Sequence, residues 1–393
     1  MSSNDWEQRK LGDVFEQTAN FVNPNDDDIE LWSLTVEDGL TPKSERYNRE
    51  FLVKKKTNFK EVRPGDIVYN PMNMTLGAVG FNGMAKSVAV SGYYTTMVAN
   101  KGYDSYYINT WLKSPQAISL YKTFATGSLK EKQRVQFPTL SIIPATFPEH
   151  DEQTKIGSYF EHLDHLITLH QRKCEETKTL KKYMLQKMFP QNGHSVPEIR
   201  FSGFTEDWEQ RKLSELSEKT FGGGTPKTSN ESFWKGNIPW IQSSDLIEGS
   251  LFDIEPRKYI SQEAVDKSAT KLVPENSVAI VTRVGVGKLA FMPFSYATSQ
   301  DFLSLSVLKT EPQFTVYALY KKLQSELNAV QGTSIKGVTK NELLAKEIMI
   351  PCYEEQEKIG SYLHSLDHLI TLHQHKCEEL QNIKKFMLKN MFI

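Results

Sequence analysis

Histidine pairs at helical spacing are the first residues of this sequence whose types could do chemistry. His162 and His165, and likewise His364 and His368, stand three or four positions apart, a spacing that two zinc-binding imidazoles on one helix face would need. Ser365 replaces His162 where this stretch recurs later in the chain, and neither set is completed by a carboxylate or a cysteine. We therefore predict no metal site.

The chain has three cysteines, Cys174, Cys352 and Cys377, and none of them forms a Cys-x-x-Cys pair. This predicts a protein of a reducing compartment without a disulfide framework. The N-terminus lacks a basic segment followed by an apolar one, and no apolar stretch is long enough to span a bilayer. The sequence predicts a cytoplasmic protein that does not contact a membrane.

Two short segments resemble enzyme motifs only in part. Asn70-Pro-Met-Asn73 is similar to the Asn-Pro-Pro-Tyr motif of adenine methyltransferases, but it lacks the second proline and the aromatic residue. Gly285-Val-Gly-Lys288 lacks the spacing of a phosphate-binding loop, and a tight turn between strands explains it. We find no nuclease carboxylate cluster and no Ser-His-Asp arrangement. We predict that the chain has no catalytic residues of its own.

The chain repeats itself. Residues 5–11 return as 207–213, and residues 152–189 return as 355–392 with about two-thirds of the positions identical. The intervening segments diverge but share a frame, in which Trp32 corresponds to Trp240, Pro64 to Pro274, and Leu76-Gly77 to Val286-Gly287. A unit of this length is too long for a solenoid repeat and indicates a duplicated domain plus a helix. Such a duplication implies pseudo-twofold symmetry.

The 152–189 and 355–392 segments have the pattern of a coiled coil, with apolar residues at alternating steps of four and three. Pro148 and Pro351 precede them, where a proline is tolerated. Leu180 and Met184 extend the first apolar stripe, and Ile383 and Met387 the second. Helices of 38 residues would be about 57 Å long, enough to act as a ruler between half-sites one DNA turn apart. The predicted seam and assembly residues are Ile156, Phe160, Leu163, Ile167, His170, Ile359, Leu363, Leu366, Ile370 and His373.

The diverged segments are rich in predicted strands, such as 67–69, 277–282 and 302–308, with short helices near 106–123 and 316–331. The predicted fold class is α+β, with two mixed, strand-rich domains joined by two long antiparallel helices in a pseudo-twofold coiled coil. The predicted divisions are a first recognition domain, 1–150; a central repeated helix, 151–190; a linker, 191–206; a second recognition domain, 207–351; and a C-terminal repeated helix, 352–393.

Motifs of the second half resemble a known family. Phe221-Gly-Gly-Gly-Thr-Pro-Lys227, Trp234 and Ile238-Pro-Trp-Ile-Gln-Ser-Ser-Asp-Leu246 look like the target recognition domain of specificity subunits of type I restriction-modification systems. That family is similar in alternating two variable domains with two repeated helices, so the resemblance covers the whole chain. The first half lacks Gly-Gly-Thr-Pro and keeps only Trp32-Ser-Leu, as expected of domains that read different DNA.

The resemblance implies a DNA-reading subunit without cofactors. Two methyltransferase subunits would bind S-adenosylmethionine and methylate adenine, and restriction subunits using ATP and Mg would join them. The expected target is double-stranded DNA with an asymmetric, bipartite sequence. Because the formal net charge is −1, local basic clusters or basic partners must supply the attraction to DNA.

Polar and basic loop residues are the candidates for DNA contact, since such side chains read base edges and bind phosphates. Those of the first domain are Tyr69, Asn70, Asn73, Ser91, Tyr93, Tyr94, Ser128, Lys130, Lys132 and Arg134. Those of the second domain are Thr225, Lys227, Gln242, Ser243, Ser244, Asp245, Arg283, Lys288, Ser299, Gln300, Asp301, Ser334 and Lys336.

Two other functions stay open at this point. One is a stand-alone DNA methyltransferase or nuclease with diverged motifs, which the purified chain would reveal by modifying DNA alone. The other is a coiled-coil scaffold whose globular domains bind proteins, which predicts an assembled complex without sequence-dependent DNA binding.

Overall fold

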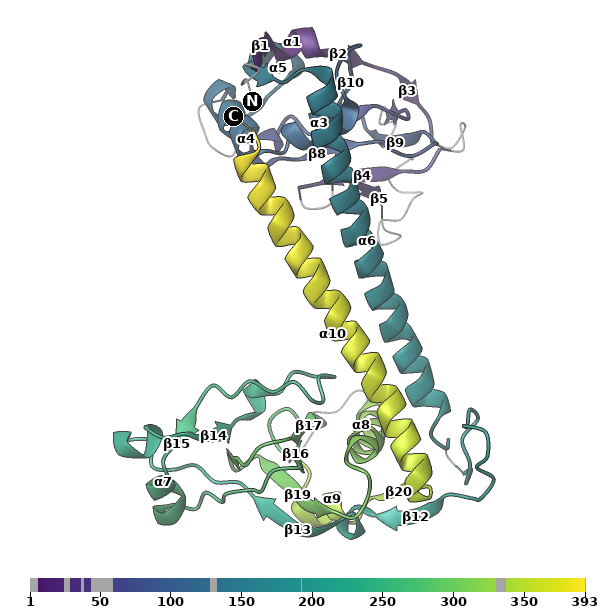
Figure 1. Ribbon diagram of the computed structural model, residues 1–393, viewed down its shortest axis with the longest axis vertical. Helices are drawn as coiled ribbons and strands as arrows, with labels where there is room; N and C mark the ends of the chain where they lie inside the picture. The colour runs from purple at the N-terminus through teal and green to yellow at the C-terminus, as the bar shows by residue number, and fades with distance from the viewer. Residues whose placement is uncertain are drawn as a thin grey trace. The chain divides into compact units, whose positions relative to one another are not determined.

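The computed structural model of the protein describes residues 6–24, 29–36, 39–43, 59–127, 133–191, 193–329 and 337–392. The chain forms two compact units, Met1–Arg172 with Gln374–Ile393 and Lys173–His373. Each unit combines one strand-rich domain with parts of both long helices (Figure 1). The α+β class predicted from the sequence is confirmed.

A four-stranded antiparallel sheet in the order β2-β10-β7-β8 forms the centre of the first domain. Its strands are β2 (Phe15–Thr18), β7 (Ile67–Tyr69), β8 (Val79–Phe81) and β10 (Thr95–Ala99). The other elements are β1 (Glu7–Lys10), α1 (Leu11–Val14), β3 (Phe21–Val22), β4 (Trp32–Thr35), β5 (Gly39–Pro42), β6 (Phe59–Val62), η1 (Met74–Leu76), β9 (Val88–Ser91), α3 (Ser105–Trp111), α4 (Pro115–Phe124), α5 (Phe137–Ser141) and β11 (Pro144–Phe147).

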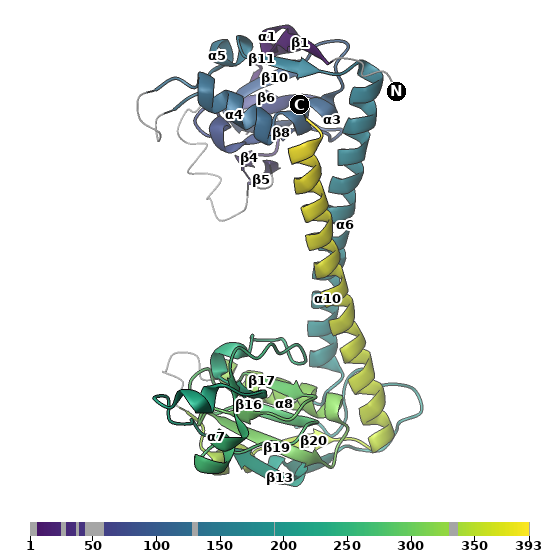
Figure 2. The same cartoon turned by 60° about the vertical axis from the view of Figure 1, so that its left-hand side comes forward.

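The second domain has the same sheet in the order β13-β19-β16-β17. Its strands are β13 (Ser217–Gly222), β16 (Ser277–Val281), β17 (Leu289–Met292) and β19 (Phe302–Leu308). The helix α8 (Pro312–Ala329) contacts β17 (Figure 2). The other elements are β12 (Glu209–Lys212), η3 (Leu213–Glu215), η4 (Glu231–Trp234), β14 (Ile238–Ile241), η5 (Ser243–Asp245), β15 (Tyr259–Ile260), α7 (Gln262–Lys267), β18 (Ala297–Thr298), α9 (Lys340–Leu344) and β20 (Glu347–Ile350).

The two domains share the order of the central sheet, which supports the duplication where the sequences diverge. In both, the first strand pairs with the last one, β1 with β11 and β12 with β20. The predicted strands 67–69 and 302–308 are found with those bounds, and 277–282 is one residue shorter. The helix predicted near 106–123 is two helices, because Ser114 caps α4 and Pro115 occupies its first turn, where proline is tolerated.

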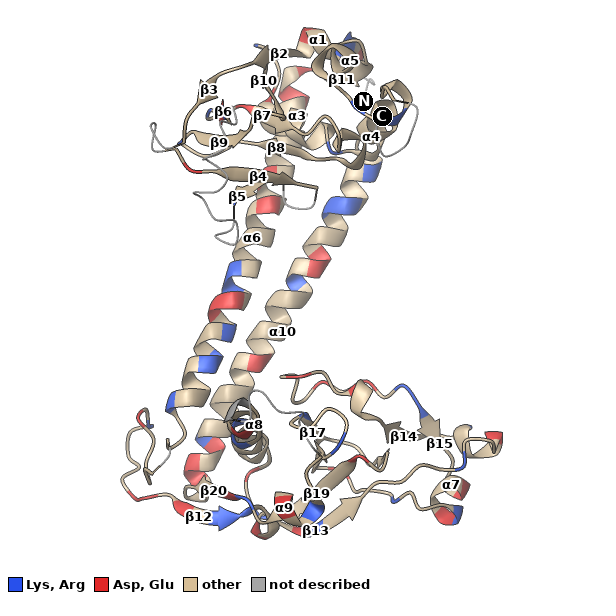
Figure 3. Ribbon diagram, turned by 180° about the vertical axis from the view of Figure 1, so that it is seen from behind, with Lys and Arg blue, Asp and Glu red and all other residues tan. Residues whose placement is uncertain are grey.

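The long helices α6 (His150–Lys187) and α10 (Tyr353–Asn390) each have 38 residues and carry charges of both signs along their length (Figure 3). Each helix begins in one unit and ends in the other. Phe392, just after α10, stacks on Phe160 of the first unit, and Phe189, just after α6, stacks on Phe314 of the second. Burying such an aromatic side chain contributes about 1.5–3 kcal/mol. The Met-Phe pair at the end of each long helix therefore packs into the core of the unit in which that helix ends.

Equivalent contacts between the helices establish their antiparallel pairing inside each unit. In the first unit, Cys377 Sγ lies 3.6 Å from the Ile167 carbonyl oxygen, and Lys384 Nζ lies 2.5 Å from Asp164 Oδ1. In the second unit, Lys181 Nζ lies 2.5 Å from Asp367 Oδ1. The predicted seam positions are buried or half-buried, as the following set shows: Ile156, Phe160, Leu163, Ile167, His170, Ile359, Leu363, Leu366, Ile370 and His373.

One predicted continuation of the seam is wrong. Leu180 is exposed, whereas the neighbouring Lys181 is buried. The Lys181 ammonium pairs with Asp367 and lies 5.5 Å from the centre of the Tyr317 ring, and the Tyr317 hydroxyl donates to Asp367 Oδ2 at 2.5 Å. Burial and the adjacent Asp367 carboxylate raise the pKa of the Tyr317 phenol well above its usual value, so it stays a donor. This charged network occupies the place expected for leucine.

Candidate nucleic-acid interface

Several loops of the second domain meet at one end of its central sheet. Ser299 N donates to the Ile241 carbonyl at 2.9 Å, which joins the segment after β18 to the end of β14. Thr282 N donates to Asp301 O at 2.7 Å, and Val338 N donates to Thr282 O at 2.8 Å. These bonds bring the β16–β17 connection, 282–288, beside residues 242–245, 299–301 and 337–338. We call this set of segments the second loop edge.

The corresponding segments of the first domain meet in the same way. Thr95 pairs with Tyr69 in the sheet, so the turn 91–94 before β10 lies next to the end of β7. Val135 N donates to Pro71 O at 2.9 Å, which adds the segment after α4. The β7–β8 connection, 70–78, thus lies between two other loops. We call this set the first loop edge.

The turn at residues 91–94 is held rigidly and presents an aromatic side chain. Tyr94 N donates to the Ser91 carbonyl at 3.0 Å, and Lys60 Nζ donates to the Tyr94 carbonyl at 2.7 Å. Tyr93 at its tip is 87% exposed. Since both bonds hold backbone atoms, the Tyr93 ring is free to contact a ligand.

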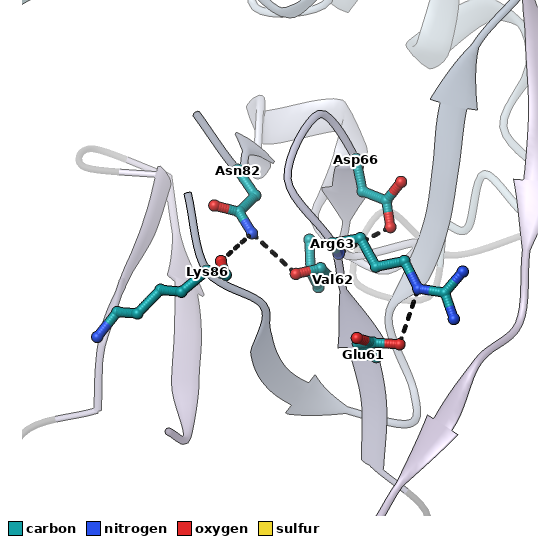
Figure 4. Close-up of polar contacts among 6 residues, drawn as sticks. All are labelled: Glu61, Val62, Arg63, Asp66, Asn82 and Lys86. Atoms are coloured by element: carbon teal, nitrogen blue, oxygen red, sulfur yellow. Dashed lines mark hydrogen bonds and ion pairs between the residues drawn. The ribbon is translucent and has the colours of Figure 1, made fainter. Parts of the chain in front are cut away.

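In the first domain, the buried Asn82 side chain joins the end of β6 to the turn at residues 82–86 (Figure 4). Asn82 Nδ2 donates to the carbonyls of Val62 and Lys86, at 2.8 and 3.0 Å. Asp66 accepts from Arg63 N at 2.9 Å, and burial raises the pKa of its carboxyl. The Arg63 guanidinium donates to Glu61 at 2.9 Å. The Asn82 and Asp66 side chains therefore bind backbone polar atoms. Their role is to support the turns and not to bind a ligand.

Four of the predicted DNA contacts have structural tasks instead. Tyr69 is fully buried in an inner strand covered on both faces, and this burial raises its pKa. Asp245 is buried and accepts from Gln242 N at 2.8 Å, as the reciprocal partner in a capping box. Ser299 is buried beside Asp301, and Lys288 Nζ donates to the Leu246 carbonyl at 2.9 Å. Burial leaves Tyr69, Asp245 and Ser299 little surface for a DNA contact, and the Lys288 ammonium already donates to a backbone carbonyl.

The remaining described candidates differ in exposure. The exposed ones are Asn73, Tyr93, Arg134, Thr225, Lys227, Ser244, Arg283 and Gln300. The half-buried ones are Asn70, Ser91, Tyr94, Gln242, Ser243 and Asp301. Ser128, Lys130, Lys132, Ser334 and Lys336 lie outside the described residues.

Two exposed arginines lie on the loop edges, Arg134 on the first and Arg283 on the second. A third exposed cation, Lys227, lies outside the second loop edge and follows the Gly-Thr-Pro segment that β13 leads into. None of the three forms an ion pair with another residue in the described parts of the chain. An exposed cation without a partner is suited to a phosphate or a base edge.

Asn70-Pro-Met-Asn73 forms a turn at the first loop edge. Asn70 Oδ1 accepts from Met72 N at 3.0 Å, and Asn73 N donates to the Asn70 carbonyl at 3.0 Å. The Asn70 side-chain oxygen therefore stabilises its own turn, which explains the Asn-Pro pair structurally.

The residues that dock each long helix onto its domain are not among the predicted site residues. Gln153 Nε2 donates to the Pro148 carbonyl at 2.9 Å while Gln153 Oε1 accepts from Asp104 N at 3.1 Å. Gln356 repeats both bonds with Pro351 and Glu311, at 2.8 and 2.9 Å. The sequence does contain a signal for this contact, since the same Gln stands at the same position of both copies.

Glycine follows four residues later in both copies because the helix approaches backbone there. A Cβ at Gly157 would lie 2.8 Å from Tyr107 N, and a Cβ at Gly360 would lie 2.8 Å from Phe314 N. The retained Gln and Gly therefore record a repeated docking contact between each helix start and its own domain.

The predicted linker is packed against the second unit. Arg200 donates from Nε and Nη2 to the two carboxylate oxygens of the buried Glu355, both at 2.8 Å, and Phe201 contacts the Tyr362 ring edge-on. Lys321 Nζ donates to the carbonyls of Phe189 and Pro190, and burial lowers its pKa to about 8. The segment after α6 is thus fixed to the start of α10 and to α8.

The helix histidines have local partners. His162 Nδ1 lies 2.6 Å from the Ser158 carbonyl, and the His364 ring packs edge-on against Phe252. Over the described ranges, no group of three or more His, Cys, Asp or Glu side chains is arranged to hold a metal ion. Among the helices placed by the structure, none has the length and apolar character to cross a membrane.

Comparisons with known proteins point to one family. The family described as "Type I restriction modification DNA specificity domain" matches residues 205–382. The MjaIX specificity subunit of a type I restriction enzyme from Methanocaldococcus jannaschii is 31% identical over 194 residues. This match covers 48% of the present chain but only 44% of that protein, less than two thirds of its length.

Other similarities extend over the full length. The putative MjaX specificity subunit from the same organism is 22% identical over 97% of this chain and 91% of its own. The solved structure of a type I restriction-modification S subunit from M. genitalium covers 100% of this chain and 98% of its own, with 12% identity and a TM-score of 0.63. At that identity the likeness shows a shared fold alone.

Proposed function

We propose that this chain, whose residues 205–382 match the type I specificity domain and which is similar over its full length to a putative specificity subunit, binds double-stranded DNA and selects the site at which partner subunits act. The observation that carries the proposal is that the corresponding loop edges bear unlike exposed side chains, such as Tyr93 and Arg134 in one domain and Ser244 and Arg283 in the other. Two edges with different chemistry fit an asymmetric, bipartite target.

In this proposal the chain provides recognition and assembly, and the chemistry belongs to its partners. Two methyltransferase subunits would bind S-adenosylmethionine and methylate adenine, and restriction subunits would use ATP and Mg. The complex would act on cellular DNA in the cytoplasm.

Exposed apolar residues on the long helices support docking of partner subunits. Leu166 and Leu369, at equivalent positions of α6 and α10, are both exposed, as are Tyr183 and Phe386. Recurrence of the same exposed positions in both copies favours two similar partners bound in equivalent ways.

The test is DNA binding by the chain assembled with its methyltransferase subunits. Arg283→Ala should weaken DNA binding. If Arg283 contacts a guanine, the loss costs about 1–3 kcal/mol and relaxes the sequence preference of one half-site. If it contacts a phosphate, the slope of log binding constant against log salt concentration falls by about 1. Arg211→Ala is the matched control, because this exposed arginine lies on β12 and pairs with Glu209. Equal binding of all duplexes by the wild-type complex would favour a scaffold, and DNA methylation by the chain alone would favour an enzyme.

A further inference from the structure

An apolar side chain stands at the tip of the β16–β17 connection, where none was expected to matter. Val284 is 71% exposed, between the exposed Arg283 and Gly285. A single exposed valine is ordinary on a protein surface, so exposure alone carries no argument. The argument for a function rests on two further observations: Val284 lies on the second loop edge, and the connection that carries it is held in place.

The connection that carries Val284 is fixed from both sides. Gly285 and Gly287 have φ values of +88° and +95°, which valine or another branched residue would adopt only with strain. Gly287 packs so closely against Leu327 of α8 that a Cβ there would overlap the Leu327 side chain. Lys288 Nζ holds the Leu246 carbonyl at 2.9 Å, and Val281 N donates to the Lys288 carbonyl at 2.9 Å. The tip is therefore presented with little freedom.

The corresponding connection of the first domain also exposes apolar side chains, although the two sequences share little beyond Leu76-Gly77 and Val286-Gly287. Met72 and Leu76, in the β7–β8 connection, are 53% and 60% exposed. Gly77 has a φ of +89° and lies against Ile118 of α4, as Gly287 lies against α8. The same place in both domains thus combines a glycine turn seated on a helix with an exposed apolar residue.

We infer that this connection supplies an apolar base contact in each half-site, and that Val284 contacts the C5-methyl group of a thymine in the second. The inference rests on the proposed DNA-binding function. The thymine methyl is the apolar group that base pairs present in the major groove, where polar side chains read the other edges. Val284 follows Arg283 and lies in the connection that approaches Ser243. Its neighbours are polar, so this surface suits the edge of a base pair better than an apolar patch of another protein.

A double-mutant cycle between protein and DNA tests the contact. The complex of this chain with its methyltransferase subunits is first used to define the methylated motif. Deoxyuridine, which lacks only the methyl group, then replaces each thymine of the second half-site in turn. We expect one position at which wild type loses about fourfold in affinity, the value of one buried methyl group. Val284→Ala should show no such loss there.

Leu76→Ala is the control, because it truncates an exposed apolar residue in the corresponding connection of the other domain. It should leave the deoxyuridine penalty of the second half-site unchanged. The inference is overturned if the second half-site contains no thymine, if no thymine replacement weakens wild type, or if Val284→Ala keeps the full penalty. If the complex has no defined motif at all, the proposed function itself fails, before the deoxyuridine series begins.

Discussion

Asp367 and Asp164 occupy the same position in the two copies of the long helix, and replacing each by alanine should cost very different amounts of stability. Both carboxylates accept from an equivalent lysine at 2.5 Å, Asp367 from Lys181 and Asp164 from Lys384. Only Asp367 also accepts from a buried phenol, that of Tyr317. The equivalent place in the first domain holds Thr110, whose hydroxyl donates to the Tyr106 carbonyl instead.

The magnitudes follow from exposure. The Asp367 side chain is 23% exposed and its removal leaves a buried ammonium and a buried hydroxyl without an acceptor, which costs about 3 kcal/mol. The Asp164 side chain is 52% exposed, and a pair of this kind contributes about 0.2–1 kcal/mol. The duplication therefore supplies its own control, with the same substitution in nearly the same local sequence.

Hydrogen exchange measured by mass spectrometry suits this comparison, because it reports each unit separately and does not require two-state unfolding of the whole chain. Asp367→Ala should speed exchange by about a hundredfold in the slowest amides of α8 and of residues 360–372. Asp164→Ala should change the amides of α3 and of residues 157–169 by less than about fivefold. Equal effects of the two substitutions, or a larger effect of Asp164→Ala, would refute the assignment of Lys181, Asp367 and Tyr317 as a stabilising network.

Three further outcomes are expected. Gly360→Ala should destabilise the second unit by about 1–3 kcal/mol in denaturant unfolding, because its Cβ would meet Phe314 N, whereas Ser158→Ala, outside this contact, should change stability by less than about 0.5 kcal/mol. A fragment of residues 1–195 should dimerise in the presence of methyltransferase subunits and specify a symmetric site, since its own Phe189 is equivalent to Phe392; sedimentation showing a monomer would contradict this. Deleting 171–177 together with 374–380 removes about 10 Å of each helix and should shorten the spacer of the target by about three base pairs; altered half-site bases in the methylated motif would argue against the helices as a ruler.

The repeats, the strands and the long helices could be predicted from the sequence because they depend on local periodicity and on identity between copies. The burial of Lys181 in place of Leu180 could not, since adjacent positions lie at the same margin of a helical stripe and the choice depends on Asp367 and Tyr317, far away in the chain. The burial of Tyr69 could not be predicted either, because its strand is covered on both faces, where alternation gives no signal.

Other features of the site depended on three-dimensional contacts. The role of Asp245 has a sequence signal, since it is the third residue after Gln242 in a capping box, but an exposed polar loop residue has the same residue type. Val284 has no sequence signal of its own, because an exposed and a buried valine cannot be told apart by residue type. Its exposure depends on how Gly285 and Gly287 turn the chain over α8.

The most direct measurement of the central claim is the methylated motif written by the assembled complex, read by sequencing of modified bases, for the wild-type chain and for chains in which one domain is replaced. The account predicts an asymmetric motif with two separated halves, of which exchanging residues 207–351 for the corresponding domain of a relative changes one half and leaves the other intact. A motif that is unaffected by the exchange, or that changes in both halves, would contradict it.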